Sequence, residues 1–278
     1  MNRAGGRGEA AAYRGGMSLR EEGYPLAAAV SPRLQVIDHV DSTNARLMRD
    51  AHADAEGHPH LSVLLTRDQR AGRGRLDRVW TAPPGTALAV SVLLRVGAVE
   101  VADRGWIPLI AGAAMRDAIA AQLPGETVAL KWPNDVLVGA GPQARKISGI
   151  LTEVLPSDPL SVVVGAGVNT AMPTFDLPVP TATSFADLKA TADEDRLLAD
   201  FLTGLRDGIA DLAVGGHAAV ADRVTEHCST LGAEVAASLP GGAMLHGRAV
   251  RLDDTGRLVL VSEGVESVVG AGDVIHVR

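Results

Sequence analysis

The chain has 278 residues and a formal net charge of −7 at pH 7, with 46% apolar and 21% charged residues. This composition is typical of a globular protein with one large domain and a small appendage, and it disfavours a nucleic-acid binder, which usually carries a basic domain. Cys228 is the only cysteine, which excludes an intramolecular disulfide and a thiolate metal site and favours a reducing, cytoplasmic location.

Residues 1–33 are rich in Gly, Ala, Arg and Glu and have no apolar periodicity, so we expect a disordered leader. Met17 leaves an internal start open. The leader lacks the apolar stretch of a signal peptide, and no run of about 18 apolar residues predicts a membrane span. Ordered chain is expected to begin at the β-like run LQVIDHV, Leu34–Val40.

Residues 34–230 are predicted to form a mixed α/β domain. Ser42 is a plausible N-cap for a short helix, and LSVLLT is a strand that leads into an arginine-rich segment. Further strands are expected in TALAVSVLLRV, TVALKW, KISGILTEVL and LSVVVGAGVN, and further helices over 104–123, about 194–214 and 217–230.

Residues 231–278 change in character. Short β-type runs alternate with glycine-containing turns, which predicts a small barrel or sandwich. A domain of this size is marginal by itself, so we expect it to dock on its neighbour.

The segment QRAGRGRLDRVW, Gln69–Trp80, contains four arginines in an acidic chain. It is not a Walker A loop, because GxxxxGK[ST] is missing. By itself a solvated loop explains it best. The functional alternative is that glycines let the backbone close over a ligand while arginines bind carboxylate or phosphate.

Four other motifs are equally ambiguous one at a time. KWPND (residues 131–135) is typical of a turn, a lysine at a strand end is usually solvated, and GAGVN fits a tight strand end. DSTN is most simply a helix N-cap, although a helix N-terminus also binds polar ligands. His58 and His60 have no partner at metal-ligand spacing, and we interpret them as loop residues.

The order of the motifs is more specific than any one of them. DSTN, Q-x₂-GRGR…W, KWPND, K-x-x-GIL-x-E and G-x-G-x-N, followed by a β appendage, resemble the biotin protein ligases over residues 34–278. The resemblance implies an α+β fold with a mixed sheet flanked by helices, related to class II aminoacyl-tRNA synthetases, and a C-terminal SH3-like barrel. It divides the chain into a leader (1–33), a catalytic domain (34–230) and an SH3-like domain (231–278).

The resemblance also implies the reaction and the site. Biotin and ATP, with Mg²⁺, would form biotinyl-5′-AMP, and a lysine of a biotin carboxyl carrier protein would then take the biotin. Arg73 and Arg75 would act with Lys146 on the carboxylate and the α-phosphate. The implied catalytic residues are Lys146, Arg73 and Asp135, with Asp135 also as a Mg²⁺ ligand. The implied biotin-binding residues are Ser42, Thr43, Asn44, Gln69, Gly72, Arg73, Arg75, Trp80, Lys146 and Gly149, and the implied ATP-binding residues are Arg73, Arg75, Arg78, Trp80, Lys131, Asn134 and Asn169.

Two departures from the family pattern weaken individual assignments. Ala171 replaces a second asparagine after Asn169, and Leu76–Asp77 replace Arg-Gly, which makes the role of Arg78 uncertain. We expect no DNA-binding domain, no nucleic-acid or membrane partner, and a monomer or weak homodimer. The alternatives are a lipoate or octanoyl ligase on the related fold, and a non-catalytic phosphate or nucleic-acid binder.

Overall fold

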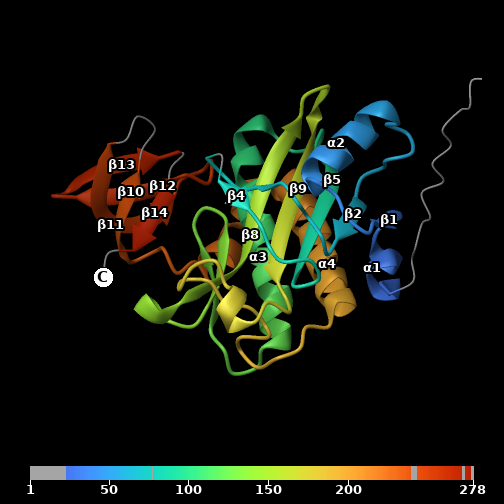
Figure 1. The fold of residues 1–278 in the computed structure, drawn as a ribbon. Helices are drawn as coiled ribbons and strands as arrows, with labels where there is room; N and C mark the ends of the chain where they lie inside the picture. The colour runs from blue at the N-terminus through green and yellow to red at the C-terminus, as the bar shows by residue number, and fades with distance from the viewer. Residues whose placement is uncertain (1–22, 77, 239–242, 271–272, 277–278) are drawn as a thin grey trace, which may run out of the picture.

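The computed structural model describes residues 23–76, 78–238, 243–270 and 273–276. A seven-stranded sheet forms its centre, in the order β1-β2-β5-β9-β8-β7-β6 (Figure 1). The β1–β2 pair is parallel and the other pairs are antiparallel, so the predicted mixed sheet is confirmed. The strands are β1 (Arg33–Val36), β2 (Ser62–Thr66), β5 (Ala87–Arg95), β6 (Val128–Lys131), β7 (Asp135–Val138), β8 (Arg145–Leu155) and β9 (Asp158–Asn169).

Helices cover both faces of this sheet. On one face α3 (Ile107–Gln122), which follows a 3₁₀ turn at Val101–Trp106, packs beside α4 (Glu194–Gly215) over the large apolar core. On the other face α2 (Thr43–Ala53) packs over a small cluster. That cluster consists of Leu47, Ala51, Leu64, Leu93 and Val163.

The segment just before β1 is folded, which corrects the prediction of a disordered leader over residues 1–33. A short helix, α1 (Pro25–Val30), packs on α4, and Ala27 is fully buried. The first N–H groups of a helix have no partner inside the helix. Here the backbone N–H groups of Leu26 and Ala27 both donate to the Asp195 carboxylate, at 3.0 Å each. Residues 24–33 are therefore part of the fold, while residues 1–22 of the expected leader lie outside the described residues.

We predict that Tyr24→Phe lowers stability by about 1 kcal/mol at neutral pH, because the Tyr24 hydroxyl donates to Glu194 Oε2 at 2.9 Å. Burial, followed by the Glu194 charge, raises the pKa of Tyr24 far above its usual value of 10. Above pH 10 the Tyr24 hydroxyl thus keeps its proton in the folded protein and loses it in the unfolded chain. The contribution of Tyr24 to the free energy of unfolding therefore falls as pH rises above about 10. Denaturant unfolding at pH 7 and 10.5 checks this, since the stability difference between wild type and variant should shrink. A constant difference would contradict it.

The predicted helix over 217–230 is wrong in extent. α4 ends at Gly215, its C-cap Gly216 has a φ of 64° in the left-handed region, and only a 3₁₀ turn (His217–Ala219) and α5 (Ala221–Thr225) follow. The chain then leaves the helix to pair with the edge of the sheet. Leu130 N donates to the His227 carbonyl at 2.9 Å, and Ser229 N donates to the Leu130 carbonyl at 2.8 Å. The residues that were predicted to form the last helical turns instead cover the edge strand β6.

The KWPND segment forms the predicted turn, and it joins β6 to β7. Lys131 and Asp135 face each other in the β6–β7 ladder, and the Trp132–Pro133 peptide is cis. The sequence prediction does not include β7, because its apolar run is short and follows directly on turn-forming residues.

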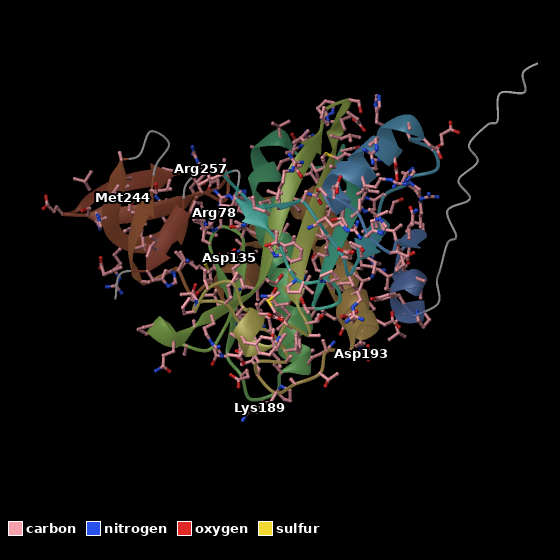
Figure 2. The ribbon with its side chains drawn as sticks, viewed as in Figure 1. Arg78, Asp135, Lys189, Asp193, Met244 and Arg257 are labelled. Atoms are coloured by element: carbon pink, nitrogen blue, oxygen red, sulfur yellow. The ribbon has the colours of Figure 1, made fainter. Side chains whose placement is uncertain are left out.

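The C-terminal residues form a separate five-stranded antiparallel sheet in the order β13-β12-β11-β10-β14, which confirms the predicted run of short strands. Its strands are β10 (Glu234–Ser238), β11 (Met244–Leu252), β12 (Leu258–Ser262), β13 (Val265–Val269) and β14 (Asp273–His276). Two indole N–H groups of the larger domain bind the β11–β12 turn. Trp106 Nε1 donates to the Asp254 carbonyl at 2.9 Å, and Trp132 Nε1 donates to the Gly256 carbonyl at 3.0 Å. Arg257 lies at the side next to the larger sheet (Figure 2). Among the described residues, no helix combines the length and apolarity of a membrane span.

Candidate active site

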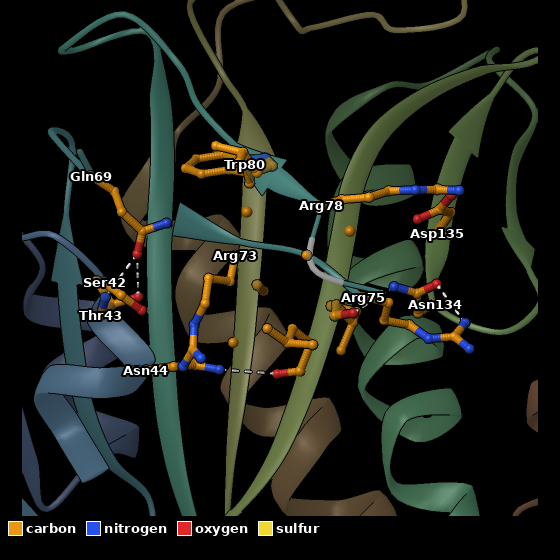
Figure 3. A pocket seen from close by; sticks show the side chains of 18 of the residues that line it. Ser42, Thr43, Asn44, Gln69, Arg73, Arg75, Arg78, Trp80, Asn134 and Asp135 are labelled. Atoms are coloured by element: carbon orange, nitrogen blue, oxygen red, sulfur yellow. Dashed lines mark hydrogen bonds between the residues drawn. The ribbon is translucent and has the colours of Figure 1, made fainter. Parts of the chain in front are cut away.

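The arginine-rich segment forms a hairpin over the α2 face of the sheet. Its strands β3 (Gly72–Arg73) and β4 (Val79–Trp80) pair antiparallel, and a cavity of about 160 Å³ lies between this hairpin, the N-terminus of α2 and strands β7–β9 (Figure 3). Arg73, Arg75 and Arg78 line this cavity, as the functional alternative expects, and Arg73 and Arg78 are also exposed to solvent. The lining residues are Ser42, Thr43, Asn44, Gln69, Arg73, Gly74, Arg75, Leu76, Arg78, Val79, Trp80, Asn134, Asp135, Lys146, Gly149, Ile150, Leu151, Gly165, Ala166 and Gly167.

Three glycines make the floor of the cavity, and each has a functional side chain in the space that a Cβ would need. A Cβ on Gly149 would lie 2.9 Å from Lys146 Nζ, one on Gly165 would lie 2.4 Å from Asn44 Oδ1, and one on Gly167 would lie 2.7 Å from the Trp80 ring. Gly165 and Gly167 belong to the last residues of β9, which ends at Asn169, so GAGVN is the strand end that the sequence suggested. Their missing side chains create the hollow.

One end of the cavity is neutral and polar. Thr43 donates to Gln69 Oε1 twice, from its backbone N at 2.8 Å and from Oγ1 at 3.0 Å (Figure 3). This fixes the orientation of the Gln69 amide, so its two N–H groups and the Thr43 hydroxyl lone pairs are available to a ligand. Ser42 Oγ accepts from Ala45 N at 3.3 Å, which confirms the predicted N-cap.

Asn44 shares this end but holds other protein groups. Its Oδ1 accepts from Ser91 Oγ at 2.6 Å, and its Nδ2 donates to the Glu153 carboxylate at 2.8 Å and to the Leu151 carbonyl at 3.3 Å. Both amide N–H groups are therefore in use. Asn44 shapes the pocket and does not present a free donor to a ligand.

The opposite end is cationic. Lys146 Nζ lies 2.6 Å from Asp135 Oδ1, and the Asn134 amide donates to the Ile150 carbonyl at 2.7 Å. Arg75 reaches across from the hairpin to Asn134 Oδ1 at 3.4 Å, and Arg78 extends toward the same side (Figure 3). Arg75, Arg78 and Lys146 all line this end of the cavity, and guanidinium and ammonium groups are the donors that bind carboxylate and phosphate.

The backbone of Lys146 is fixed by the 174–187 loop. Lys146 N donates to the Thr181 carbonyl at 2.7 Å, and Thr183 N donates to the Lys146 carbonyl at 2.8 Å. Asp187 anchors this loop through an ion pair with Arg145 at 2.5 Å. The hydrogen bond from Thr174 is the largest cause that keeps the pKa of Asp187 below its usual range, with further hydrogen bonds from Thr183 and Arg145. Asp187 therefore stays ionised and holds the strand that presents Lys146.

Arg73 does not lie with Lys146, which corrects the predicted pairing. Its Nη2 is 2.9 Å from Glu153 Oε1, and in Figure 3 it lies beside Asn44, away from Arg75 and Asp135. Lys146 Nζ lies beside Gly149, and Glu153 is four residues further along β8, about 13 Å at a rise of ~3.3 Å per residue.

Three predicted ligand-binding residues are outside the cavity lining. Gly72 packs behind it, where a Cβ would lie 2.4 Å from Gln69 Nε2, so it acts through Gln69. Asn169 donates to the Thr183 carbonyl at 2.9 Å and supports the loop next to Lys146. Lys131 is on β6, beyond β7.

Sequence reasoning missed several residues of the cavity. Leu76 and Val79 are exposed apolar residues of the hairpin, and Leu76 has a positive φ of 53°. Ile150, Leu151, Gly165 and Ala166 belong to the sheet floor and walls. Period-2 alternation through Gly149 and Gly167 could have placed Leu151 and Gly165 on the same face.

No cluster of three or more His, Cys, Asp or Glu side chains with metal-ligand geometry occurs among the described residues. Asp135 is the carboxylate nearest the cationic end, and Lys146 already contacts it. A Mg²⁺ ion that is bound mainly through ATP phosphates and water fits such a site with a single carboxylate.

The chain matches the model of the biotin/lipoate A/B protein ligase family over residues 36–169. The biotin–[acetyl-CoA-carboxylase] ligase of Mycobacterium tuberculosis is 39% identical over 252 residues, covering 88% of this chain and 90% of that protein. The Paracoccus denitrificans ligase of the same name is 31% identical over 86% of this chain and 98% of that protein.

The fold agrees with these matches. The structure of a biotin protein ligase from Aquifex aeolicus in complex with biotin and ATP superposes with a TM-score of 0.71 at 24% identity, covering 88% of this chain and 99% of that chain. A mixed sheet with helices and a C-terminal antiparallel sheet is thus the fold of this group. Extended identity to two curated ligases, together with the motif order on one cavity, shows that the chain belongs to the biotin protein ligases of the biotin/lipoate A/B protein ligase family.

Proposed function

We propose that the protein is an ATP-dependent biotin ligase that forms biotinyl-5′-AMP and then transfers biotin to a lysine of the biotin carboxyl carrier protein of an acyl-CoA carboxylase. The observation that best supports this is the division of one cavity into a neutral end at Thr43 and Gln69 and a cationic end at Lys146, joined by a glycine floor. Biotin has a neutral cyclic urea at one end, an aliphatic chain, and a carboxylate at the other.

The neutral end suits the urea ring. A urea carbonyl accepts hydrogen bonds, which the Gln69 amide can donate, and a urea N–H donates, which the Thr43 hydroxyl can accept. Trp80 adds a flat apolar wall above Gly167. A site built to hydrogen-bond a substrate group rejects an analogue without that group by large factors, which favours biotin over lipoate here.

The cationic end suits the first reaction step. The biotin carboxylate oxygen attacks the α-phosphorus of ATP, the bond to the bridging oxygen breaks, and pyrophosphate leaves with the electron pair. Both reactants are anions, so Lys146 and Arg75 would reduce their repulsion and stabilise the charge that develops on the phosphate. Arg78 and Asn134 line the same end and would bind the phosphates or the adenylate.

The second step uses the same end. The ε-amine of the carrier lysine attacks the acyl carbon of biotinyl-5′-AMP, the acyl–phosphate bond breaks, and AMP leaves. Asp135 would receive the proton or orient the amine, since it is the carboxylate that lines this end of the cavity. The hairpin over the cavity would also keep water from the mixed anhydride.

A Mg²⁺ ion would neutralise phosphate charge when ATP is bound, with Asp135 as its one protein carboxylate. Further parts of the proposal rest on the family resemblance. They are an SH3-like C-terminal domain at 231–278, a catalytic domain over 24–230 related to class II synthetases, a cytoplasmic location, and a monomer or weak homodimer without a nucleic-acid partner.

ATP–pyrophosphate exchange tests the first step. We expect exchange that requires biotin and does not occur with lipoate or octanoate. Exchange without biotin, or equal rates with lipoate, would refute the assignment. Salt-sensitive nucleic-acid binding in the absence of exchange would instead support the binding-module alternative.

A further inference from the structure

The Arg73–Glu153 pair places a carboxylate next to a cavity for an anionic substrate. Glu153 is on β8 and shares its face with Gly149 and Leu151, because alternate residues of a strand point to the same side. Its side chain is 23% exposed and that of Arg73 is 51% exposed. A negative charge in this place needs a reason, since it repels the substrate carboxylate.

Each oxygen of Glu153 has its own partner. Oε2 accepts from Asn44 Nδ2 at 2.8 Å, and Asn44 is held from behind by the buried Ser91 hydroxyl at 2.6 Å. Oε1 accepts from Arg73 Nη2 at 2.9 Å (Figure 3). The carboxylate is thus anchored to the sheet and holds the guanidinium at the neutral end of the cavity.

The pair changes the charge of that end. An unpaired guanidinium beside Thr43 and Gln69 would attract the carboxylate of a substrate that enters the wrong way round. Paired with Glu153, Arg73 still has N–H groups for a neutral acceptor, but its charge is cancelled.

The following inference rests on the proposed function. We propose that Glu153 is a specificity-determining residue: it neutralises Arg73, so that a carboxylic acid substrate binds with its carboxylate only at the Lys146 end. Arg73 is then part of head-group recognition and does not belong to the anion cradle.

The test uses pentanoate, which matches the side chain of biotin, and its uncharged analogue pentanamide. Binding of each to the full-length protein is followed by NMR titration. In Glu153→Gln the Asn44 bond can persist while the charge is lost, so we expect pentanoate to bind roughly tenfold more tightly than to wild type, as a freed charged donor allows. Pentanamide binding should not change.

Three further variants make the result specific. Glu153→Ala should act like Glu153→Gln, which covers the case that one variant folds poorly. Glu153→Asp keeps the charge and should retain wild-type pentanoate binding, and Arg73→Gln/Glu153→Gln should lose the gain. Glu266→Gln is the matched control, because Glu266 forms a similar ion pair with Arg251, at 2.7 Å, on the C-terminal sheet.

Equal pentanoate affinity of wild type and both uncharged variants would overturn the proposal. Equal tightening for pentanamide would also overturn it, since it would show a merely looser pocket. These measurements need no turnover, whereas failure of the proposed function appears as wild-type protein without biotin-dependent exchange, so the two failures are distinguishable.

Discussion

Lys146→Ala is expected to lower biotin-dependent ATP–pyrophosphate exchange by about 10²–10³-fold at saturating substrates. The substitution removes the ammonium that would meet the carboxylate and the α-phosphate. It also removes the cation that lies 2.6 Å from Asp135 at this end of the cavity. Exchange rates with labelled pyrophosphate measure the effect.

The matched control is Lys189→Ala. Lys189 is an exposed lysine on the loop after the site, and Figure 2 shows it far from Asp135. It should keep wild-type exchange. Exchange within about threefold of wild type in Lys146→Ala would show that the chemistry does not use this end of the cavity.

Gly165→Ala is expected to lower stability by about 1–3 kcal/mol and to weaken biotin binding strongly. The new Cβ would lie 2.4–2.9 Å from three atoms of the Asn44 amide. Asn44 cannot move away cheaply, because Ser91, Leu151 and Glu153 all hold it. Denaturant unfolding gives the loss of stability, and the KM for biotin in exchange gives the loss of binding.

Gly97→Ala is the control for this substitution. It also adds one methyl group, but the nearest atom to the new Cβ is Leu160 Cδ1 at 3.8 Å, an ordinary contact. It should change neither stability nor KM measurably. A Gly165→Ala protein with wild-type stability and KM would show that Asn44 is not a fixed wall of the pocket.

The sequence predicts most of the fold where apolar periodicity is strong, as in the strands around Val63 and Val163 and the helix over α4. It fails where tertiary contacts decide. Residues 24–33 are folded because their hydrogen-bond donors bind the carboxylates of Glu194 and Asp195. Those carboxylates are about 170 positions away in the sequence. The 217–230 segment leaves its helix because the β6 edge needs partners.

In the site, too, sequence patterns predict some features and tertiary contacts decide the others. Motif order brings Gln69, Arg75, Asn134 and Lys146 to one cavity, as expected. Motif order does not indicate direction, and Arg73 contacts Glu153 and lies away from Asp135, although the resemblance grouped Arg73 with Lys146. Glu153 is the last residue of the K-x-x-GIL-x-E motif, but its position next to the pocket is known only from its contacts with Asn44 and Arg73.

The most direct measurement of the proposed activity is transfer of labelled biotin to a purified biotin carboxyl carrier domain, with mass spectrometry of the acceptor lysine. The account predicts one biotin on that lysine, only when ATP is present, with AMP and pyrophosphate released in equal amounts. No transfer by folded wild-type protein, or transfer of lipoate at the same rate as biotin, would contradict it.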